Sequence, residues 1–299
     1  MIAVLGECVA DAFAEGAGRG ELALRVLPGG GPANTAVALG RLGSDTRFLG
    51  RISGDVFGRL FLERLAGAGV DVSAVVAAAE PSTLAVASLD DAGRAVYSFH
   101  AEGAADFQWS PGELRLELLG GVSCLHTGSL ALVKEPGAGE VAGFVADAAP
   151  YVTISVDPNV RPSLAGRAAY LARLPGHADI LRLSEEDLDF LLPGTSLEAA
   201  CDGWHEQGVR LVVVTRGPEG ALVSLGGERA AVPGVPVEVV DTVGAGDAFT
   251  AGLLHRLRDH LGGRLDGLDL GTARAAAAFG AQVAALTCTV AGADLPRHR

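Results

Sequence analysis

The sequence predicts an α/β fold, with a mostly parallel central sheet, helices on both of its faces and a small additional β-sheet. Short apolar segments rich in β-branched residues alternate with longer segments of helical periodicity, which is the pattern of βαβ units. Two stretches interrupt this alternation with strand-like segments that no helix separates. The length of 299 residues and the hydrophobic content of 49% exclude a disordered chain and suit one large domain that carries an insertion.

The elements of the main sheet follow from their apolar patterns. The expected strands are short and mostly aliphatic, and they comprise residues 2–5, 47–51, 123–126, 153–156, 180–183, 211–215 and 221–225. The expected helices carry apolar residues three and four positions apart, and they comprise residues 32–42, 57–68, 139–148, 197–206, 245–260 and 270–286. Several strands end in small or polar residues. Ligands of an open α/β sheet bind beyond the carboxyl ends of its strands, so we expect the chemistry there.

The small sheet is predicted from residues 21–26, 83–89 and 95–99, of which the last two flank a turn-rich connection at 90–94. Strands without intervening helices do not belong in a doubly wound sheet. We therefore expect residues of about 12–28 and 82–104 to form a β-sheet lid over the main sheet. The alternative is an antiparallel edge on the main sheet, since mixed sheets are common. We expect residues 1–299 to form a single domain.

The charge balance and the cysteines exclude several classes of function. With 36 acidic and 23 basic residues, the chain lacks the basic face that a nucleic-acid binder needs. Its one lysine, Lys134, follows no glycine-rich loop, which excludes a Walker A motif. The four cysteines are too far apart in sequence for a zinc or CxxC redox site, and we expect free buried thiols.

No segment predicts export or membrane insertion. The N-terminus has no basic region and soon reaches Glu7, so we expect no signal peptide. Residues 275–293 carry no charge, but they are mostly Ala, Gly and Thr, which is weak for a membrane span, and we expect a buried core helix. These features predict a soluble, cytoplasmic protein.

One candidate site lies where the expected strand ending at Val240 meets the helix that starts near residue 245. Gly244, Ala245 and Gly246 would present backbone N–H groups at a helix N-terminus, which bind phosphate or stabilise a developing anion. Asp247 stands in the first turn of that helix, and a helix cap is its simplest interpretation. Beside a bound phosphate donor, the same carboxylate could take a proton from an attacking hydroxyl.

A second candidate site is the glycine run before the first predicted helix, Gly29-Gly30-Gly31-Pro32-Ala33-Asn34. Pro32 suits the first position of a helix, and the glycines allow close backbone approach. The Asn34 amide could pair with hydroxyl groups as donor and acceptor. A Rossmann loop of an NAD(P)-dependent oxidoreductase is the alternative, but the final Gly of G-x-G-x-x-G is missing.

Three further segments follow predicted strands and could serve as turns or as parts of a site. They are Asp11 at the end of segment 6–11, the run Asp157-Pro158-Asn159-Val160-Arg161, and the run Thr215-Arg216-Gly217-Pro218-Glu219-Gly220. The small residues of the last run could admit a nucleotide base or ribose.

In their order along the chain, these segments resemble the ribokinase-like (PfkB) carbohydrate kinase family. Residues 29–43, Gly-Gly-Gly-Pro-Ala-Asn-Thr-Ala-Val-Ala-Leu-Gly-Arg-Leu-Gly, look like its N-terminal signature. Residues 241–249, Asp-Thr-Val-Gly-Ala-Gly-Asp-Ala-Phe, look like its highly specific C-terminal signature. The resemblance covers most of the chain. It implies a central sheet with helices on both faces, a β lid, and ATP-dependent phosphorylation of a sugar hydroxyl with Mg²⁺ bound to ATP.

The resemblance also implies roles for individual residues. Asp247 would be the general base, and the anion hole for the transferred phosphoryl group would consist of Gly244, Ala245 and Gly246. The substrate would contact Asp11, Gly29, Gly30, Asn34 and Arg161. The nucleotide would contact Asn159, Ser184, Thr215, Gly217 and Gly220. Asp187 would hold Mg²⁺ through water, and a loop for a monovalent cation such as K⁺ would use Asp241 and the carbonyl of Val243.

The runs at 157–161 and 183–186 look more like the fructokinase and 2-keto-3-deoxygluconate kinase branch than like ribokinase. Residues 99–102 lack the arginine that these branches often carry near the lid, which disfavours an acidic sugar. A fructokinase-like kinase is therefore the leading hypothesis. The alternatives are a 2-keto-3-deoxygluconate or nucleoside kinase, or a non-catalytic sugar-binding regulator. The edge of the lid sheet could pair two copies into a homodimer or remain solvated.

Overall fold

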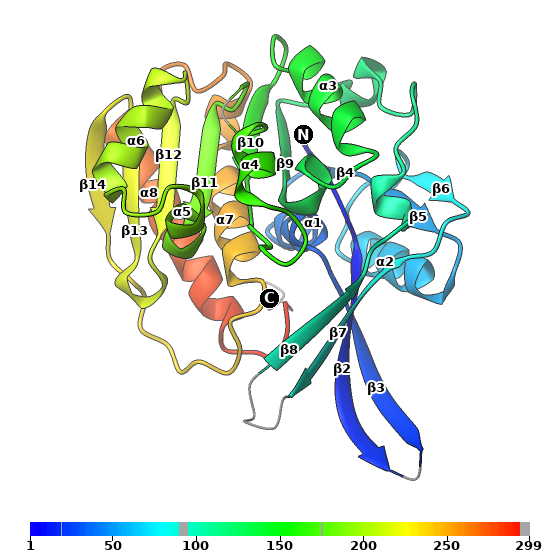
Figure 1. Cartoon of the computed structure of the whole chain (residues 1–299). Helices are drawn as coiled ribbons and strands as arrows, with labels where there is room; N and C mark the ends of the chain where they lie inside the picture. Colours follow the sequence, from blue (N-terminus) through cyan, green and yellow to red (C-terminus); the bar gives the residue numbers. More distant parts are fainter. Residues whose placement is uncertain (19, 90–94, 175, 294–299) are drawn as a thin grey trace.

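The main sheet has eight strands in the order β14-β13-β12-β11-β10-β9-β1-β4 (Figure 1). The computed structural model describes residues 1–18, 20–89, 95–174 and 176–293. The six strands from β12 to β4 run parallel, and β13 and β14 continue the sheet antiparallel. The strands are β1 Ile2–Leu5, β4 Thr46–Leu49, β9 Cys124–Gly128, β10 Thr153–Asp157, β11 Ile180–Ser184, β12 Leu211–Thr215, β13 Ala221–Leu225 and β14 Glu228–Val232.

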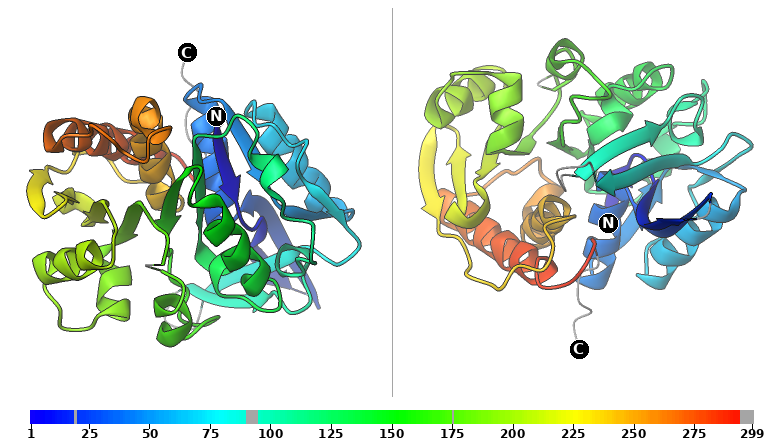
Figure 2. Two further views of the ribbon diagram at one scale, coloured as in Figure 1. Left: turned by 90° about the horizontal axis from the view of Figure 1, so that it is seen from above. Right: turned by 60° about the horizontal axis from the view of Figure 1, so that its bottom comes forward.

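Helices cover both faces of this sheet, as the alternation of buried residues requires. Ile2 and Val4 of β1 lie in the core beneath α1, α2, α7 and α8, whereas Ala3 and Leu5 lie in the core beneath α3 to α6 (Figures 1 and 2). The predicted α/β fold is thus confirmed. The helices are α1 Gly31–Arg41, α2 Val56–Gly67, α3 Ala138–Ala148, α4 Arg167–Leu171, α5 Glu185–Leu191, α6 Leu197–Glu206, α7 Ala245–Leu261 and α8 Leu270–Thr287.

The second, small sheet projects from the main body (Figures 1 and 2). Its order is β3-β2-β7-β8, with β2 parallel to β7 and the other neighbours antiparallel. The predicted small sheet is therefore present, and the alternative of an edge on the main sheet is wrong. The expected turn at 90–94 lies outside the described residues. The strands are β2 Val9–Gly18, β3 Glu21–Gly29, β7 Thr83–Leu89 and β8 Ala95–His100.

Three predictions of individual elements need correction. The strand expected to end at Val240 is absent, because residues 233–244 connect β14 to α7 without forming a strand. The expected strand at 47–51 is divided, because the chain leaves the main sheet at Gly50 and β5 (Arg51–Ser53) pairs with β6 (Val76–Ala78) instead. The sequence also did not predict β2, whose Ala- and Gly-rich composition lacks the β-branched residues of a typical strand. Tertiary pairing with both β3 and β7 makes it a strand.

The charge-free segment near the C-terminus forms most of α8, which packs against α7. A Cβ atom at Gly252 would lie 2.8 Å from the Cα atom of Gly280, so small residues let the two helices approach closely. One face of α8 is buried, as expected of a core helix. Within the described ranges, no helix is long and apolar enough to cross a membrane. The four cysteines are free thiols, three of them buried.

Candidate active site

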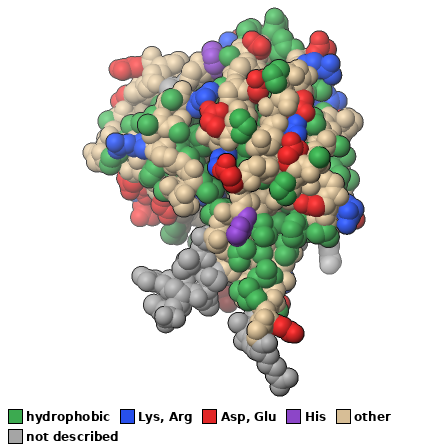
Figure 3. All heavy atoms as spheres, turned by 45° about the vertical axis from the view of Figure 1, so that its right-hand side comes forward, with side chains coloured by type: hydrophobic (Ala, Val, Ile, Leu, Met, Phe, Trp, Pro, Cys, Tyr) green, Lys and Arg blue, Asp and Glu red, His purple; other side chains and the backbone are tan. Residues whose placement is uncertain are grey.

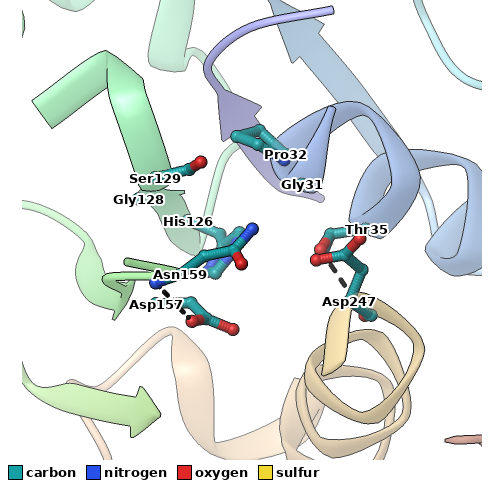
Figure 4. Close-up of a pocket in the computed structure, with 9 residues that line it drawn as sticks. All are labelled: Gly31, Pro32, Thr35, His126, Gly128, Ser129, Asp157, Asn159 and Asp247. Carbon is teal, nitrogen blue, oxygen red and sulfur yellow. Dashed lines mark hydrogen bonds between the residues drawn. The ribbon is translucent and has the colours of Figure 1, made fainter. Parts of the chain in front are cut away.

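A polar pocket lies where the carboxyl ends of β9 and β10 meet the N-termini of α1 and α7 (Figure 4). This is the edge of the sheet at which ligands of open α/β folds bind. The side chain of Asp247 points into it from α7, opposite Asn159 and Asp157 on the β10 side (Figure 4). The lining residues are Gly31, Pro32, Thr35, His126, Gly128, Ser129, Asp157, Asn159 and Asp247.

Asp247 has the environment of a proton acceptor. Its carboxylate accepts a hydrogen bond of 2.8 Å from Nδ2 of Asn34. The pKa of Asp247 is raised to about 7, mainly by burial. The hydrogen bond from Asn34 and the charges of Arg161 and Arg182 lower it, and the charge of Asp157 contributes to the rise. A carboxylate with a pKa near neutrality both exists ionised at cellular pH and retains a proton once it has taken one.

The N-terminus of α7 is formed by the Gly-Ala-Gly segment. Gly244 has the left-handed φ of 76°, and among the described residues no side chain caps this helix end. Both glycines are closely packed: a Cβ atom at Gly244 would lie 2.5 Å from Cβ of Ala293, and one at Gly246 would lie 2.8 Å from Nη1 of Arg182. The helix therefore directs its first-turn amides and its dipole at the pocket edge beside Asp247.

Arg182 lies behind this helix end, and the sequence analysis missed it. Its Nη1 donates to Asp157 at 2.8 Å, its Nη2 donates to the hydroxyl of Thr215 at 2.6 Å, and its guanidinium stacks on Phe249 at 5.5 Å from the ring centroid. Asp157 also accepts a hydrogen bond of 3.1 Å from Thr250. The available signal was an arginine in the middle of the buried strand β11.

The glycine run before α1 allows carboxylate and amide side chains to converge. A Cβ atom at Gly29 would lie 1.9 Å from Oδ2 of Asp11, and one at Gly31 would lie 2.4 Å from Nδ2 of Asn159. Gly30 has a φ of 97° and lies directly on the backbone of Glu7. The run is thus needed for close approach, as the sequence indicated.

Arg161 and Asp11 add opposite charges to the same region. Burial raises the pKa of Asp11 to about 6, whereas the charges of Arg161 and Arg64 lower it. Arg161 donates to the carbonyl oxygens of Asn159 and Val160, which holds its side chain near its own turn. Its charge also lowers the pKa of Asp247. Of the five residues predicted to bind substrate, Asn34 contacts the predicted base and the charge of Arg161 reaches it, whereas Asp11 lies at Gly29. None of the five lines the pocket itself.

The comparisons with known proteins place this chain in a family. Residues 1–298 match the model of the pfkB family carbohydrate kinases. The chain belongs to this family. It is a carbohydrate kinase, as the resemblance of its two signatures implied, and the pocket lies between those signatures.

The most similar relatives include fructokinases. The fructokinase of Rhizobium leguminosarum bv. trifolii is 36% identical over 262 residues, which cover 86% of this chain and 80% of that protein. The structure of the Xylella fastidiosa fructokinase with bound ATP has a TM-score of 0.90 and 28% identity, covering 98% of this chain and 93% of that one. The fructokinase of Vibrio cholerae O395 with fructose, ADP and calcium has a TM-score of 0.81, 29% identity, and coverage of 98% and 94%; a double mutant of it contains potassium.

Of the five predicted nucleotide residues of this carbohydrate kinase, Asn159 lines the pocket, and the other four lie along the same sheet edge outside its lining. Thr215 ends β12 beside Arg182. Gly217 and Gly220, with φ of 52° and 92°, form the tight turn to β13. The hydroxyl of Ser184 donates to Asp187 at 2.8 Å in a capping box at the start of α5. None of these four predicted nucleotide residues lines the pocket itself.

The predicted metal residues of the kinase make hydrogen bonds within the protein. The Asp187 carboxylate accepts from the backbone N–H of Val160 and from the backbone and hydroxyl of Ser184. Asp241 accepts from the backbone N–H groups of Val243 at 3.0 Å and Gly292 at 2.8 Å. In the part of the chain that the structure describes, no three His, Cys, Asp or Glu side chains cluster as they would around a protein-bound metal ion.

Proposed function

We propose that this carbohydrate kinase transfers the γ-phosphoryl group of ATP to a hydroxyl of fructose. The observation that carries the proposal is the position of Asp247, whose pKa of about 7 and place in the first turn of α7 put a proton acceptor beside an anion-binding helix end. The relatives support the two substrates, because fructokinases have been solved with ATP, and with fructose and ADP.

Catalysis in this proposal rests on positioning and electrostatics. The sugar hydroxyl loses its proton to Asp247 as the oxygen attacks the γ-phosphorus, and the bond to the β-phosphate oxygen of ADP breaks. The amides of Gly244, Ala245 and Gly246 stabilise the charge on the transferred group. Arg182 adds a buried positive charge behind the same helix end. A helix N-terminus and arginines thereby perform the role that a P-loop lysine has elsewhere.

Cations are proposed to act with these groups. Mg²⁺ bound to ATP offsets the phosphate charge. Asp187 already accepts three hydrogen bonds, so it fits contact with Mg²⁺ through water rather than direct ligation. For a monovalent cation such as K⁺, we propose Asp241 and the carbonyl of Val243, because Asp241 fixes the loop that leads into the helix end.

Fructose is favoured over an acidic sugar by the charges in and near the pocket. Asp157 and Asp247 line it with two carboxylates, and Asp11 lies outside the lining, against Gly29. The pKa of Asp247 is raised to about 7 and that of Asp11 to about 6. A carboxylate on the substrate would add charge repulsion to the cost of burying these carboxylates. Hydroxyl groups can instead donate to these oxygens, with Asp11 and Asn34 as partners and Gly29 and Gly30 allowing their approach.

The small sheet is proposed to be a lid over the sugar, since its strands β2 and β3 carry Asp11 and Gly29 where the sheet joins the main body.

The edge strand β3 of the small sheet exposes Leu22 and Leu24 on one face, at 57% and 41% of their surface. Hydrophobic side chains gather on this projecting sheet (Figure 3). We propose that two copies pair through it. Sedimentation of Leu22→Lys/Leu24→Lys tests this: a dimer that persists in the variant contradicts it.

The test of the function is a coupled assay of ADP formation with fructose, 2-keto-3-deoxygluconate and a set of nucleosides. Fructose should give the highest kcat/KM. Asp247→Asn should lower kcat by about 10²–10⁴-fold while the ATP affinity measured by calorimetry changes little. Near-wild-type turnover by this variant contradicts the assigned base. Binding of ATP and sugar without any product would instead identify a sugar-binding regulator.

A further inference from the structure

The guanidinium of Arg64 joins three segments that surround the proposed base. Arg64 lies on α2, and its Nη1 donates to the carbonyl oxygen of Pro28 at 2.7 Å and to Oδ1 of Asn34 at 2.8 Å. Its Nη2 donates to the carbonyl oxygen of Ala293 at 2.6 Å. One side chain thus connects strand β3 of the small sheet, the first turn of α1 and the segment after α8.

The contact with Arg64 determines how the amide of Asn34 is oriented. A guanidinium has only donors, so the oxygen of the amide must face Arg64. The Nδ2 group then points the other way and donates to Asp247 at 2.8 Å. Without Arg64, the amide could turn and present its oxygen to Asp247, and a protonated carboxyl would donate a hydrogen bond to that oxygen.

We propose that Arg64 is a positioning residue for the catalytic base. It keeps the Asn34 amide donating to Asp247, so that the carboxylate is held ionised and aimed at the substrate. This inference rests on the proposed role of Asp247. Arg64 also holds Ala293, which packs against Gly244 at the proposed anion hole: a Cβ atom on that glycine would lie 2.5 Å from Cβ of Ala293.

The pH dependence of turnover reports on this arrangement. Four groups act on the pKa of Asp247 besides its burial: Asn34 lowers it by hydrogen bonding, the charges of Arg161 and Arg182 lower it, and Asp157 raises it. Replacement of Arg64 removes the support for the hydrogen bond from Asn34 and leaves Arg161, Arg182 and Asp157 in place. The pKa of Asp247 should then rise, so that a higher pH is needed to ionise the base. The charge of Arg64 also lowers the pKa of Asp11, so Arg64→Met raises that pKa as well, whereas Arg64→Lys keeps the charge and leaves Asp11 little changed.

The experiment measures kcat and its pH profile for Arg64→Met, Arg64→Lys and the control Arg59→Met, an exposed arginine on the same helix. Arg64→Met should lower kcat by about 10–100-fold and move the acid limb to higher pH. Arg64→Lys keeps the charge but not the forked donors. Its kcat and its acid limb should therefore lie between those of Arg64→Met and those of the wild type. Arg59→Met should behave as the wild type. An unchanged acid limb in folded Arg64→Met overturns the proposal.

A double-mutant cycle shows whether Arg64 acts through Asn34. In an Asn34→Ala background, Arg64→Met should lower kcat by less than about twofold, because the amide that it orients is already absent. Equal fold-losses in both backgrounds contradict the proposal. If Arg64→Met does not fold, as judged by its thermal transition, Arg64→Gln is used in the same cycle. Two other results would contradict the proposed function rather than the role of Arg64: full activity of Asp247→Asn, or a wild-type protein that phosphorylates no sugar.

Discussion

The guanidinium of Arg182 lies directly behind Gly246, so that a Cβ atom on this glycine would come within 2.8 Å of Nη1. The arginine cannot easily withdraw, because Asp157 and Thr215 hold its two terminal nitrogens at 2.8 Å and 2.6 Å. The proposed anion hole therefore has a buried positive charge fixed behind its backbone. This relationship and the surrounding geometry lead to four predictions.

Gly246→Ala should displace either the start of α7 or Arg182. Because both support the proposed transition state, we expect kcat to fall by about 10–100-fold with a smaller change in the KM for sugar. Gly143→Ala in α3 is the matched control, since a Cβ atom there meets nothing within 4 Å. Steady-state kinetics of both variants check the prediction, and similar kcat values for the two would refute it.

Arg182→Met should reduce the stability of the protein as well as its activity. The substitution leaves the buried carboxylate of Asp157 without its ion pair, which costs about 3–5 kcal/mol in comparable buried pairs. Arg210→Met removes an exposed ion pair with Asp266 and should cost less than about 1 kcal/mol. Denaturant unfolding measures both values. Equal losses would show that the Arg182 pair has no special role.

The pH dependence should follow Asp247. Because only the ionised carboxylate accepts a proton, kcat/KM should fall about tenfold per pH unit below its pKa of about 7, with Asp11 titrating near 6 as a second step. The raised pKa also has a consequence for folding. Stability that the protonated Asp247 contributes at pH 4 is lost as the pH rises through 7. Asp247→Asn should therefore be more stable than the wild type at pH 8, as thermal unfolding can establish.

Gly29→Ala should weaken sugar binding selectively. Its Cβ atom would lie 1.9 Å from Oδ2 of Asp11, so the carboxylate must leave its present position. We expect the KM for fructose to rise about tenfold or more while the KM for ATP changes little, because the predicted nucleotide residues lie on other strands. Initial rates with each substrate varied in turn measure both constants. A rise confined to the KM for ATP would place Asp11 outside the sugar site.

Local patterns in the sequence determined the architecture and the proposed chemical centre. The alternation of short apolar segments with helical segments predicted a mostly parallel sheet covered on both faces, and this was confirmed. The run from Asp241 to Asp247 predicted a glycine-rich helix start with a carboxylate in its first turn, because such a turn depends on neighbours in the chain. The roles of these residues in phosphoryl transfer stay a prediction.

Only the tertiary structure determined which groups surround that centre. Asn34 meets Asp247 across 213 positions of sequence, and Arg64 meets Ala293 across 229. The Ala- and Gly-rich β2 likewise became a strand only through its pairing with β3 and β7. Periodicity and turn chemistry express interactions between residues a few positions apart. Contacts between distant segments depend on how the whole chain packs, and no local pattern marked Arg64 as the residue that orients the amide beside Asp247.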